Sequence, residues 1–389
     1  MKKILALVLA LCMVFALAAC GESSAPAATA TEAPAADAAT EAPAAEPAEL
    51  KVAMITDYGD ITDQSFNQTT YEAGKAWCEA RGYDFTYYKP TGDSTAERVA
   101  MIDAAVADGF NVLLMPGFAF ADTVKETAAL YPDVKYIVLD VGADDYGDYV
   151  LPENVYSAVY QEQYPGYMAG YAAVKLGYTK LGFLGGMAVP AVVRYGYGFV
   201  QGANAAAVEL GNEADVTIQY VYGNQFYGDP DITAYMDTLY AGGMEICFVA
   251  GGSIHLSACE SASKVGGKII GVDVDQAAII DGTYGEGMTV TSAMKGLAET
   301  VNTALTDLIE NDNWAAYGGK IASLGLVSAN PAENYVQLAP STQFEDGKFT
   351  EADYLALVEK LYNGEIEVSD ATDVEPETAI HVNYLGNIK

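Results

Sequence analysis

The sequence predicts an α/β protein with two lobes, each built on a parallel β-sheet. Short apolar runs alternate with helical periodicity from Leu50 onward, which is the pattern of strands and helices in parallel sheets. About 340 residues follow this point, too many for one hydrophobic core and enough for two. The strand–helix series occurs twice, and each fourth strand ends in an aspartate, Asp140 and Asp273.

The N-terminal residues 1–19 are predicted to be a signal peptide. Lys2 and Lys3 precede an apolar run that is shorter than the roughly 20 residues needed to cross a bilayer. The small residues before Cys20 resemble the lipobox of bacterial lipoproteins, and this resemblance implies cleavage before Cys20 and diacylation of its thiol. The alternative is an ordinary signal peptide cut nearby, with Cys20 incidental.

Residues 20–49 then form the predicted tether to the folded part. This segment is rich in Ala, Pro, Thr and acidic residues and contains no aromatic, Lys or Arg residue, so it is expected to be disordered. We assign residues 50–158 and 293–320 to an N-terminal lobe, and residues 159–292 and 321–389 to a C-terminal lobe. Repeated crossing of the chain between them predicts a multi-strand hinge that suits closure around a ligand.

The first series begins with a strand over 50–56 and a helix starting near Asp63, where Asp63 or Ser65 can act as the N-cap. A second helix starts at a capping box formed by Ser94 and Glu97. The remaining predicted elements of this series are strands 84–88, 111–115 and 134–139 and a helix over 122–131.

The second series begins with a helix over 166–176, where Gly and Ala side chains allow close approach of another backbone. A long helix is predicted over 190–210, and a third helix starts at Pro230 after the N-cap Asp229. Strands are predicted at 180–184, 216–221, 245–249, 268–272 and 288–291. The helix 297–311 is expected to pack on the first lobe, whereas Ile321–Val327 and the tail are expected to return to the second.

The amino-acid composition excludes a nucleic-acid-binding protein. The formal net charge is −34, and such an acidic surface repels nucleic acid and anionic headgroups. Cys78, Cys247 and Cys259 lie beyond the leader without any CxxC motif, and they are expected to be buried small hydrophobic residues.

Catalytic signatures are mostly missing, and we expect neither an enzyme nor a cofactor. The chain contains no GxxxxGK[ST] motif, and Gly251–His255 fails the nucleophile-elbow pattern because its last residue is not glycine. The two histidines, His255 and His381, have no Cys or second His at metal-ligand spacing, so no metal is expected.

Candidate ligand-binding residues follow the first strand. Because ligands of open α/β sheets bind at the carboxyl ends of the strands, the loop and first helical turn after this strand are expected at the site. They carry Asp57, Ser65, Phe66 and Asn67. Phe66 is poorly placed for a core and would suit a flat ligand, although a minor core position is the alternative.

The second series supplies the opposite wall of this site. Phe226 follows its second strand, so Phe66 and Phe226 could hold a planar base between them by stacking, worth roughly 1–3 kcal/mol per base. Asp273 could accept hydrogen bonds from two vicinal ribose hydroxyls. Lys295 would be the only cation nearby, paired with Asp273, bound to a hydroxyl, or solvated at the surface.

The order of several motifs is similar to that of the basic membrane protein (BMP) family of lipoproteins. The motifs are SFNQ, YIVLD, the segment 167–173, GFLGG, VRYGYGFVQGA, GNQFYGD, GVDVDQ and VTSAMK. That family resembles the purine-nucleoside receptors of ABC transporters. The resemblance implies a type I periplasmic-binding fold and a nucleoside between Phe66 and Phe226. It assigns base contacts to Asp57, Asn67 and Asp140, and ribose contacts to Asp273 and Lys295.

The sequence thus predicts a lipid-anchored, extracytoplasmic binding protein that delivers nucleosides, chiefly purine nucleosides, to an ABC permease. A site with three carboxylates and one lysine would repel phosphate, so nucleosides are favoured over nucleotides. A receptor for a sugar or another small polar solute is the alternative in the same class. From different classes, an extracytoplasmic enzyme that uses His255 and a sensory receptor without a transport role also stay open.

Overall fold

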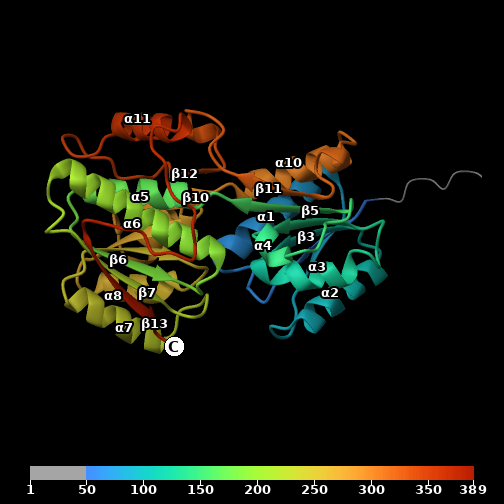
Figure 1. Ribbon diagram of the computed structural model, residues 1–389. Coiled ribbons are helices and arrows are strands. Elements are labelled where there is room, and N and C mark those ends of the chain that lie inside the picture. Colours follow the sequence, from blue (N-terminus) through green and yellow to red (C-terminus); the bar gives the residue numbers. More distant parts are fainter. Residues whose placement is uncertain (1–49) are drawn as a thin grey trace, which may run out of the picture. The chain divides into compact units, whose positions relative to one another are not determined.

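Two β-sheets organise residues 50–389, the part of the chain that the computed structural model describes (Figure 1). Each sheet is covered by helices on both faces and forms one lobe, so the predicted two-lobed α/β architecture is confirmed. The predicted signal peptide, Cys20 and the tether lie outside the described residues.

The first sheet has six parallel strands in the order β11-β5-β4-β3-β1-β2. Its alternate residues pack on opposite layers of helices, since Met54 faces α1 and α10 whereas Ile55 faces α2 and α3. The strands are β1 (Val52–Ile55), β2 (Phe85–Tyr88), β3 (Val112–Pro116), β4 (Lys135–Leu139), β5 (Val155–Tyr160) and β11 (Lys320–Leu324). The helices are α1 (Phe66–Arg81), α2 (Thr95–Ala107), α3 (Ala121–Thr127), α4 (Ala143–Tyr146) and α10 (Leu297–Ile309), with short 3₁₀ turns η1 (Phe118–Phe120) and η2 (Trp314–Ala316).

The second sheet has seven strands in the order β12-β10-β9-β8-β6-β7-β13, of which β12 is antiparallel. The outermost strand β13 runs beside β7, and its register shifts between Tyr384 and Asn387. The strands are β6 (Lys180–Gly185), β7 (Thr217–Tyr222), β8 (Ile246–Ala250), β9 (Lys268–Asp273), β10 (Thr289–Lys295), β12 (Val336–Leu338) and β13 (His381–Asn387). The helices are α5 (Gln163–Lys175), α6 (Pro190–Leu210), α7 (Pro230–Ala241), α8 (His255–Ser263), α9 (Ala277–Tyr284) and α11 (Glu351–Tyr362), with the turn η3 (Pro331–Glu333).

The two lobes use the same strand order. The order β2-β1-β3-β4-β5 in the first sheet matches β7-β6-β8-β9-β10 in the second. Asp140 directly follows β4 and Asp273 ends β9, and both have a φ of +64°. The two aspartates therefore occupy equivalent positions in the two lobes, and each adopts a left-handed backbone conformation that is uncommon outside glycine. The predicted duplication of the strand plan is confirmed.

Two predicted details are wrong. Ile321 lies in β11, which pairs with β5 of the first sheet instead of returning to the second lobe. The first helix begins at Phe66 and not near Asp63; Asp63 caps it by accepting hydrogen bonds from the backbone N–H groups of Asn67 and Gln68. Two predicted lobe boundaries, 158/159 and 292/293, are also displaced by two to three residues, because β5 runs to Tyr160 in the first sheet and β10 runs to Lys295 in the second.

The chain crosses between the lobes at three places that lie close together. The crossings are residues 161–162 after β5, Gly296 after β10, and residues 325–335 after β11. The backbone N–H of Gln161 donates to the oxygen of Leu324 at 2.9 Å, and that of Gly296 donates to Tyr335 at 2.7 Å. These bonds join the three crossings into one hydrogen-bonded hinge.

Helices α5 and α6 lie side by side on the second sheet (Figure 1). Glycines allow this contact, because a Cβ atom at Gly202 would lie 1.9 Å from the backbone oxygen of Tyr167. A Cβ atom at Gly170 would likewise lie 2.0 Å from the oxygen of Phe199. The glycines that interrupt the sequence of α6 are therefore required for backbone packing, as the prediction of close approach for 166–176 implied.

The three cysteines of the described residues also have the predicted environment. Cys78, Cys247 and Cys259 are buried and unpaired with one another, which confirms their predicted role as small hydrophobic residues. No helix within residues 50–389 has both the length and the apolar character required to cross a bilayer.

We expect Gly202→Ala to lower the free energy of unfolding by about 3 kcal/mol, because the new methyl group would push α5 and α6 apart. The matched control is Gly282→Ala in α9, where a Cβ atom meets no atom within 4 Å. This control should be neutral or stabilising by about 0.5–1 kcal/mol. Urea unfolding of both variants measures the difference, and equal stabilities would contradict the packing explanation.

Candidate ligand-binding site between the two lobes

A cavity of about 310 Å³ lies between the two lobes. Its volume is at the lower end of the range typical of small-molecule sites, roughly 300–1,000 Å³. The wall includes the loops that follow β1 and β3 in lobe 1, the lobe of the first sheet, and the loops that follow β6, β7 and β8 in lobe 2, the lobe of the second sheet. The strand pairs β1/β3 and β6/β8 are the topological switch points of the two sheets, where the strand order reverses and ligands bind in open α/β folds.

Asp57 forms part of the lobe 1 wall, two residues after the end of β1. One oxygen of its carboxylate, Oδ1, accepts the backbone N–H groups of Tyr58 at 2.6 Å and Gly59 at 2.7 Å. A Cβ atom at Gly117 would lie 2.5 Å from the other oxygen, Oδ2, so the glycine after β3 makes room for the carboxylate. Burial nevertheless raises the pKa of Asp57 above its usual value, with the two N–H bonds opposing this effect.

Phe66 and Asn67 enter the cavity wall from the first turn of α1. Asp63 fixes this turn, because it also accepts a hydrogen bond from the Asn67 side-chain amide at 3.2 Å. The Asn67 Oδ1 atom is buried and has no hydrogen-bond partner among residues 50–389. Buried acceptors are rarely left unpaired in proteins, so a donor from a ligand would be favourable there.

Phe226 supplies an aromatic ring from lobe 2. It lies in the loop between β7 and α7, and it rests on Gly186 and Gly251, where an added Cβ atom would lie 2.4 Å and 3.0 Å from the ring. The Phe118 ring of lobe 1 lies 6.4 Å from the Phe226 ring between centroids, at an angle of 50°. Aromatic rings of both lobes therefore line the same cavity, as predicted for Phe66 and Phe226.

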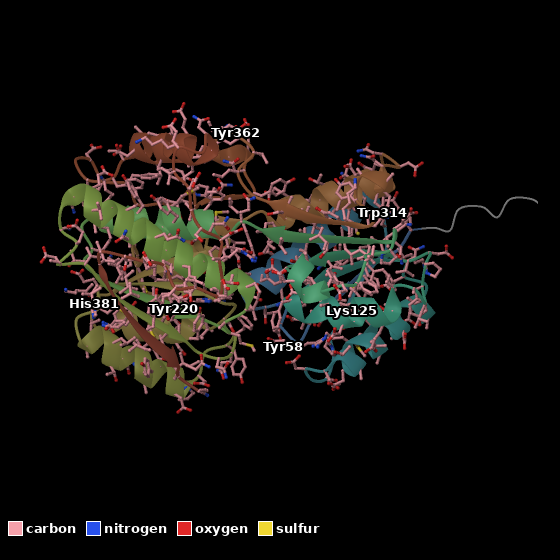
Figure 2. All side chains as sticks on the ribbon, viewed as in Figure 1. Tyr58, Lys125, Tyr220, Trp314, Tyr362 and His381 are labelled. Carbon is pink, nitrogen blue, oxygen red and sulfur yellow. The ribbon has the colours of Figure 1, made fainter. Side chains whose placement is uncertain are left out.

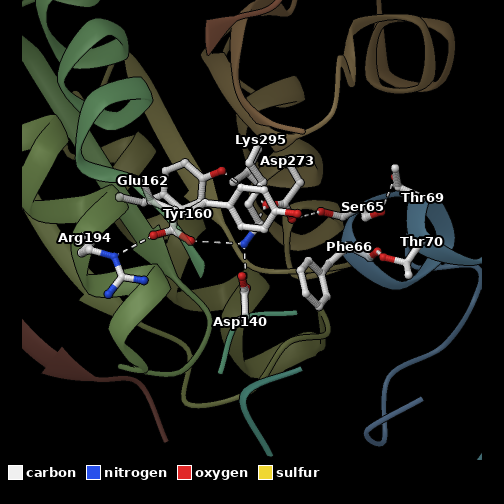
Figure 3. Close-up of polar contacts among 12 residues, drawn as sticks. Ser65, Phe66, Thr69, Thr70, Asp140, Tyr160, Glu162, Arg194, Asp273 and Lys295 are labelled. Carbon is white, nitrogen blue, oxygen red and sulfur yellow. Dashed lines mark hydrogen bonds and ion pairs between the residues drawn. The ribbon is translucent and has the colours of Figure 1, made fainter. Parts of the chain in front are cut away.

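Charged side chains from both lobes and the hinge meet at Lys295, the last residue of β10 (Figure 3). Its ammonium group lies 2.6 Å from Asp140 Oδ2, 3.5 Å from Glu162 Oε1 and 3.8 Å from Asp273 Oδ1. The same group lies 4.7 Å from the centroid of the Phe66 ring. The lysine is buried, which such a group tolerates only when its charge is paired.

Asp273 is held by hydroxyl groups in addition to Lys295. Ser65 Oγ donates a hydrogen bond to Asp273 Oδ2 at 2.6 Å (Figure 3). The Tyr195 hydroxyl lies 3.4 Å from Oδ1 of the same carboxylate. Ser65 belongs to lobe 1 and Asp273 to lobe 2, so their bond joins the lobes. The orientation of this carboxylate is thereby fixed by the protein in this arrangement of the lobes.

The pKa of the Asp140 carboxyl is raised although the group forms an ion pair with Lys295. Burial raises its pKa, and the neighbouring carboxylates Glu162 and Asp273 act in the same direction, against the attraction of Lys295; the result is a pKa of about 6. Its second oxygen, Oδ1, is buried without a hydrogen-bond partner among the described residues. Among the described residues, only one of the two carboxylate oxygens of Asp140 therefore has a hydrogen-bond partner.

The structure brings nearly all predicted site residues to one cavity. Seven of them line it: Asp57, Phe66, Asn67, Asp140, Phe226, Asp273 and Lys295. Ser65 lies behind the wall and contacts Asp273 instead. The expectation that Lys295 is the only nearby cation is wrong, because Lys89 also lines the cavity, where it pairs with Asp60 at 2.8 Å.

Sequence reasoning missed several residues of the site. Phe118 and Tyr195 line the cavity, and Glu162 and Arg194 lie behind it in the charged cluster. Glu162 follows the apolar strand β5 and precedes the apolar helix α5, and a lone carboxylate in such surroundings is a signal that could have been used.

The lobes also meet outside the cavity. The backbone oxygen of Gln64 accepts a hydrogen bond from the Gln276 amide at 2.9 Å, and its side chain lies 3.2 Å from His255 Nε2. At the edge of the cavity, Tyr58, labelled in Figure 2, reaches Met187 of lobe 2 with its hydroxyl at 3.4 Å. These contacts hold the two lobes together around the cavity.

His255 lies at the start of α8, outside the cavity wall. It is buried, and its Nδ1 lies 2.9 Å from the oxygen of Gly252. Burial lowers the pKa of its imidazole. Residues 50–389 also contain no group of three or more His, Cys, Asp or Glu side chains placed to hold a metal ion.

Two parallel-sheet lobes around an interlobe cavity are the architecture of type I solute-binding proteins. Solved structures of this class match closely in fold. A solute-binding protein of an ABC transporter system from Aeropyrum pernix K1 superimposes with a TM-score of 0.66 at 21% identity, covering 83% of this chain and 94% of that one. A second, from Conexibacter woesei DSM 14684, has a TM-score of 0.62 at 21% identity and covers 82% and 99%.

The chain belongs to the Bmp family, described as ABC transporter substrate-binding protein PnrA-like, whose profile matches residues 50–372. Among its relatives is the ABC transporter nucleoside-binding protein BmpA of Lactococcus lactis, 24% identical over 78% of this chain and 89% of the relative. Basic membrane protein B of Borreliella afzelii is 27% identical over 77% and 83%, respectively. The resemblance to this family that the sequence motifs indicated is confirmed.

The raised pKa of Asp140 predicts a pH-dependent difference in stability between the wild type and Asp140→Asn. A carboxyl with a higher pKa in the folded state stabilises the fold most below its unfolded pKa, and this contribution is lost as the pH rises through about 6. The wild type should therefore lose, relative to the variant, on the order of 3 kcal/mol of unfolding free energy at most between pH 4 and pH 7. Denaturant unfolding at several pH values measures this.

The control for this experiment is Asp144→Asn, because Asp144 is an exposed carboxylate outside the cavity. Its difference from the wild type should change little over the same pH range. A wild type that gains stability over Asp140→Asn as the pH rises would show that the Lys295 ion pair outweighs burial.

Proposed function

We propose that this protein captures a nucleoside, chiefly a purine nucleoside, in the interlobe cavity and delivers it to an ABC permease. The observation that carries the proposal is the pair of Phe66 and Phe226, which come from opposite lobes to line one cavity together with Asp273 and Lys295. A planar base stacks on aromatic rings, whereas carboxylates and an ammonium group suit hydroxyl groups. The name of the Lactococcus lactis relative, a nucleoside-binding protein, supports the same ligand class.

The polar groups of the wall fit the two halves of such a ligand. We assign the base to Asp57, Asn67 and Asp140, and the ribose hydroxyls to Asp273 and Lys295. Asn67 Oδ1 and Asp140 Oδ1 are buried acceptors without partners among residues 50–389, and N–H or O–H donors of a bound nucleoside would satisfy them. Ser65 acts indirectly, by orienting the Asp273 carboxylate.

The charge of the cavity argues against a nucleotide. Five aspartates but only two lysines line it, and both lysines are already paired, Lys89 with Asp60 and Lys295 with Asp140. A phosphate group would meet an excess of negative charge and no unpaired cation among the wall residues that the structure describes. The proposed ligands are therefore uncharged.

Closure of the two lobes around the ligand would capture it for delivery to the permease. The three hinge crossings allow the lobes to rotate about one axis, and Ser65–Asp273 and Asp140–Lys295 are bonds that closure would form across the cavity. We further propose that the protein is extracytoplasmic and held at the membrane by a lipid on Cys20. Lipid anchoring keeps the receptor close to its permease.

We expect inosine, guanosine and adenosine to bind, and adenosine to bind at least about 10-fold more tightly than AMP, a difference of about 1.4 kcal/mol. The reason is repulsion between the phosphate and the acidic wall. Isothermal titration calorimetry with each compound, and with glucose and galactose as sugar controls, measures the affinities. Tighter binding of AMP would refute the charge argument, and binding of a sugar alone would refute the nucleoside assignment.

Phe226→Ala should weaken nucleoside binding by about 1 kcal/mol or more, the value of one lost stacking contact. The matched control is Phe344→Ala, a half-buried phenylalanine of lobe 2 that packs away from the cavity. Calorimetry on both variants, with melting temperatures to verify folding, decides the role of the ring. Unchanged affinity in a folded Phe226→Ala protein would remove Phe226 from the site.

A further inference from the structure

Glu162 lies at the first hinge crossing, between β5 of lobe 1 and α5 of lobe 2. Its side chain has no exposed surface, although it carries a carboxylate and does not line the cavity. Acidic side chains are almost never fully buried unless they are paired. The buried carboxylate of Glu162 is therefore expected to be paired with cations.

Both oxygens of Glu162 contact cations. Oε2 accepts a hydrogen bond from Arg194 Nε at 2.7 Å, and Oε1 lies 3.5 Å from the ammonium group of Lys295 (Figure 3). Arg194 stands on α6, one residue before the cavity-lining Tyr195. The arginine thus holds one oxygen of Glu162 while the other faces Lys295.

The ammonium group of Lys295 is placed by carboxylates from three separate parts of the fold. Asp140 comes from lobe 1, Asp273 from lobe 2 and Glu162 from the hinge. Asp140 and Asp273 line the cavity and have ligand contacts in the proposed function, so a bound ligand would compete with Lys295 for their oxygen atoms. Glu162 is the member of this set whose carboxylate is not part of the wall, and it can hold the lysine in both states.

We propose that Glu162 is a positioning residue, which with Arg194 holds the ammonium group of Lys295 where the hydroxyl groups of the ligand bind. Glu162 acts through Lys295 and does not touch the ligand. This role rests on the proposed function, because that function assigns the ribose hydroxyls to Asp273 and Lys295. It predicts a defect confined to the ribose half of a nucleoside.

The test compares inosine with 2′,3′-dideoxyinosine, which lacks both vicinal hydroxyls. In Glu162→Gln the affinity for inosine should fall about 10-fold or more, in the range of one charge-assisted hydrogen bond, because the lysine loses the one carboxylate partner that does not line the cavity. The affinity for dideoxyinosine should change by less than about 3-fold. Calorimetry on the full folded chain gives both values, and their ratio is a readout that general destabilisation would not move.

The matched control is Glu209→Gln, which removes an ion pair to Lys175 on the same α5–α6 helix pair, outside the cavity. This control should keep the wild-type ratio. Equal losses for both nucleosides in Glu162→Gln, or no loss at all, would overturn the positioning role. If Glu162→Gln does not fold, Arg194→Met is measured instead, and an unchanged ratio in that variant overturns the proposal.

If the proposed function is wrong, the same calorimetry gives a different result. A wild type that binds neither nucleoside refutes nucleoside binding, whatever the role of Glu162. Crystal structures of the ligand-free wild type and Glu162→Gln then decide the positioning role. Displacement of the Lys295 ammonium group relative to Asp273, which lies on the neighbouring strand of the same lobe, would support it, and an unmoved ammonium group would overturn it.

Discussion

The buried ammonium group of Lys295 is the interaction on which the arrangement of the cavity wall depends. It is the common partner of Asp140, Glu162 and Asp273, which arrive from lobe 1, the hinge and lobe 2. Three carboxylates this close together repel one another strongly where water is excluded, and loss of the shared cation would leave buried charges unpaired. The same group also lies next to the Phe66 ring, so the aromatic and charged parts of the wall meet at one residue.

Much of the fold follows from local sequence patterns. Helix α6 has the predicted ends, Pro190 and Leu210, because an N1 proline and a following glycine mark them. The equivalent positions of Asp140 and Asp273 follow from counting strands in each series. Strand β11 could not be placed in this way, since it is a short, largely exposed strand and its partner β5 is distant in the sequence. Long-range pairing, and not local propensity, decides its sheet.

The candidate site was predictable to the extent that strand ends define it. Phe66 and Phe226 follow strands whose carboxyl ends face the cavity, and this rule places them without knowledge of the lobe arrangement. The pairing of Lys295 with Asp140 and the bond from Ser65 to Asp273 both cross between lobes. No local pattern specifies such contacts, because they depend on how two separately folded sheets meet.

The outer edge of the second sheet has a consequence for association between molecules. The family match ends at residue 372, and β13 lies beyond it, beside β7. An open, regular edge at β7 would offer unpaired backbone groups to the strands of other chains, which is a route to aggregation. Strand β13 occupies that edge, and its own register is broken near Gly386, whose φ is +72°. The sheet therefore ends in an irregular strand that is a poor template for growth by further strands.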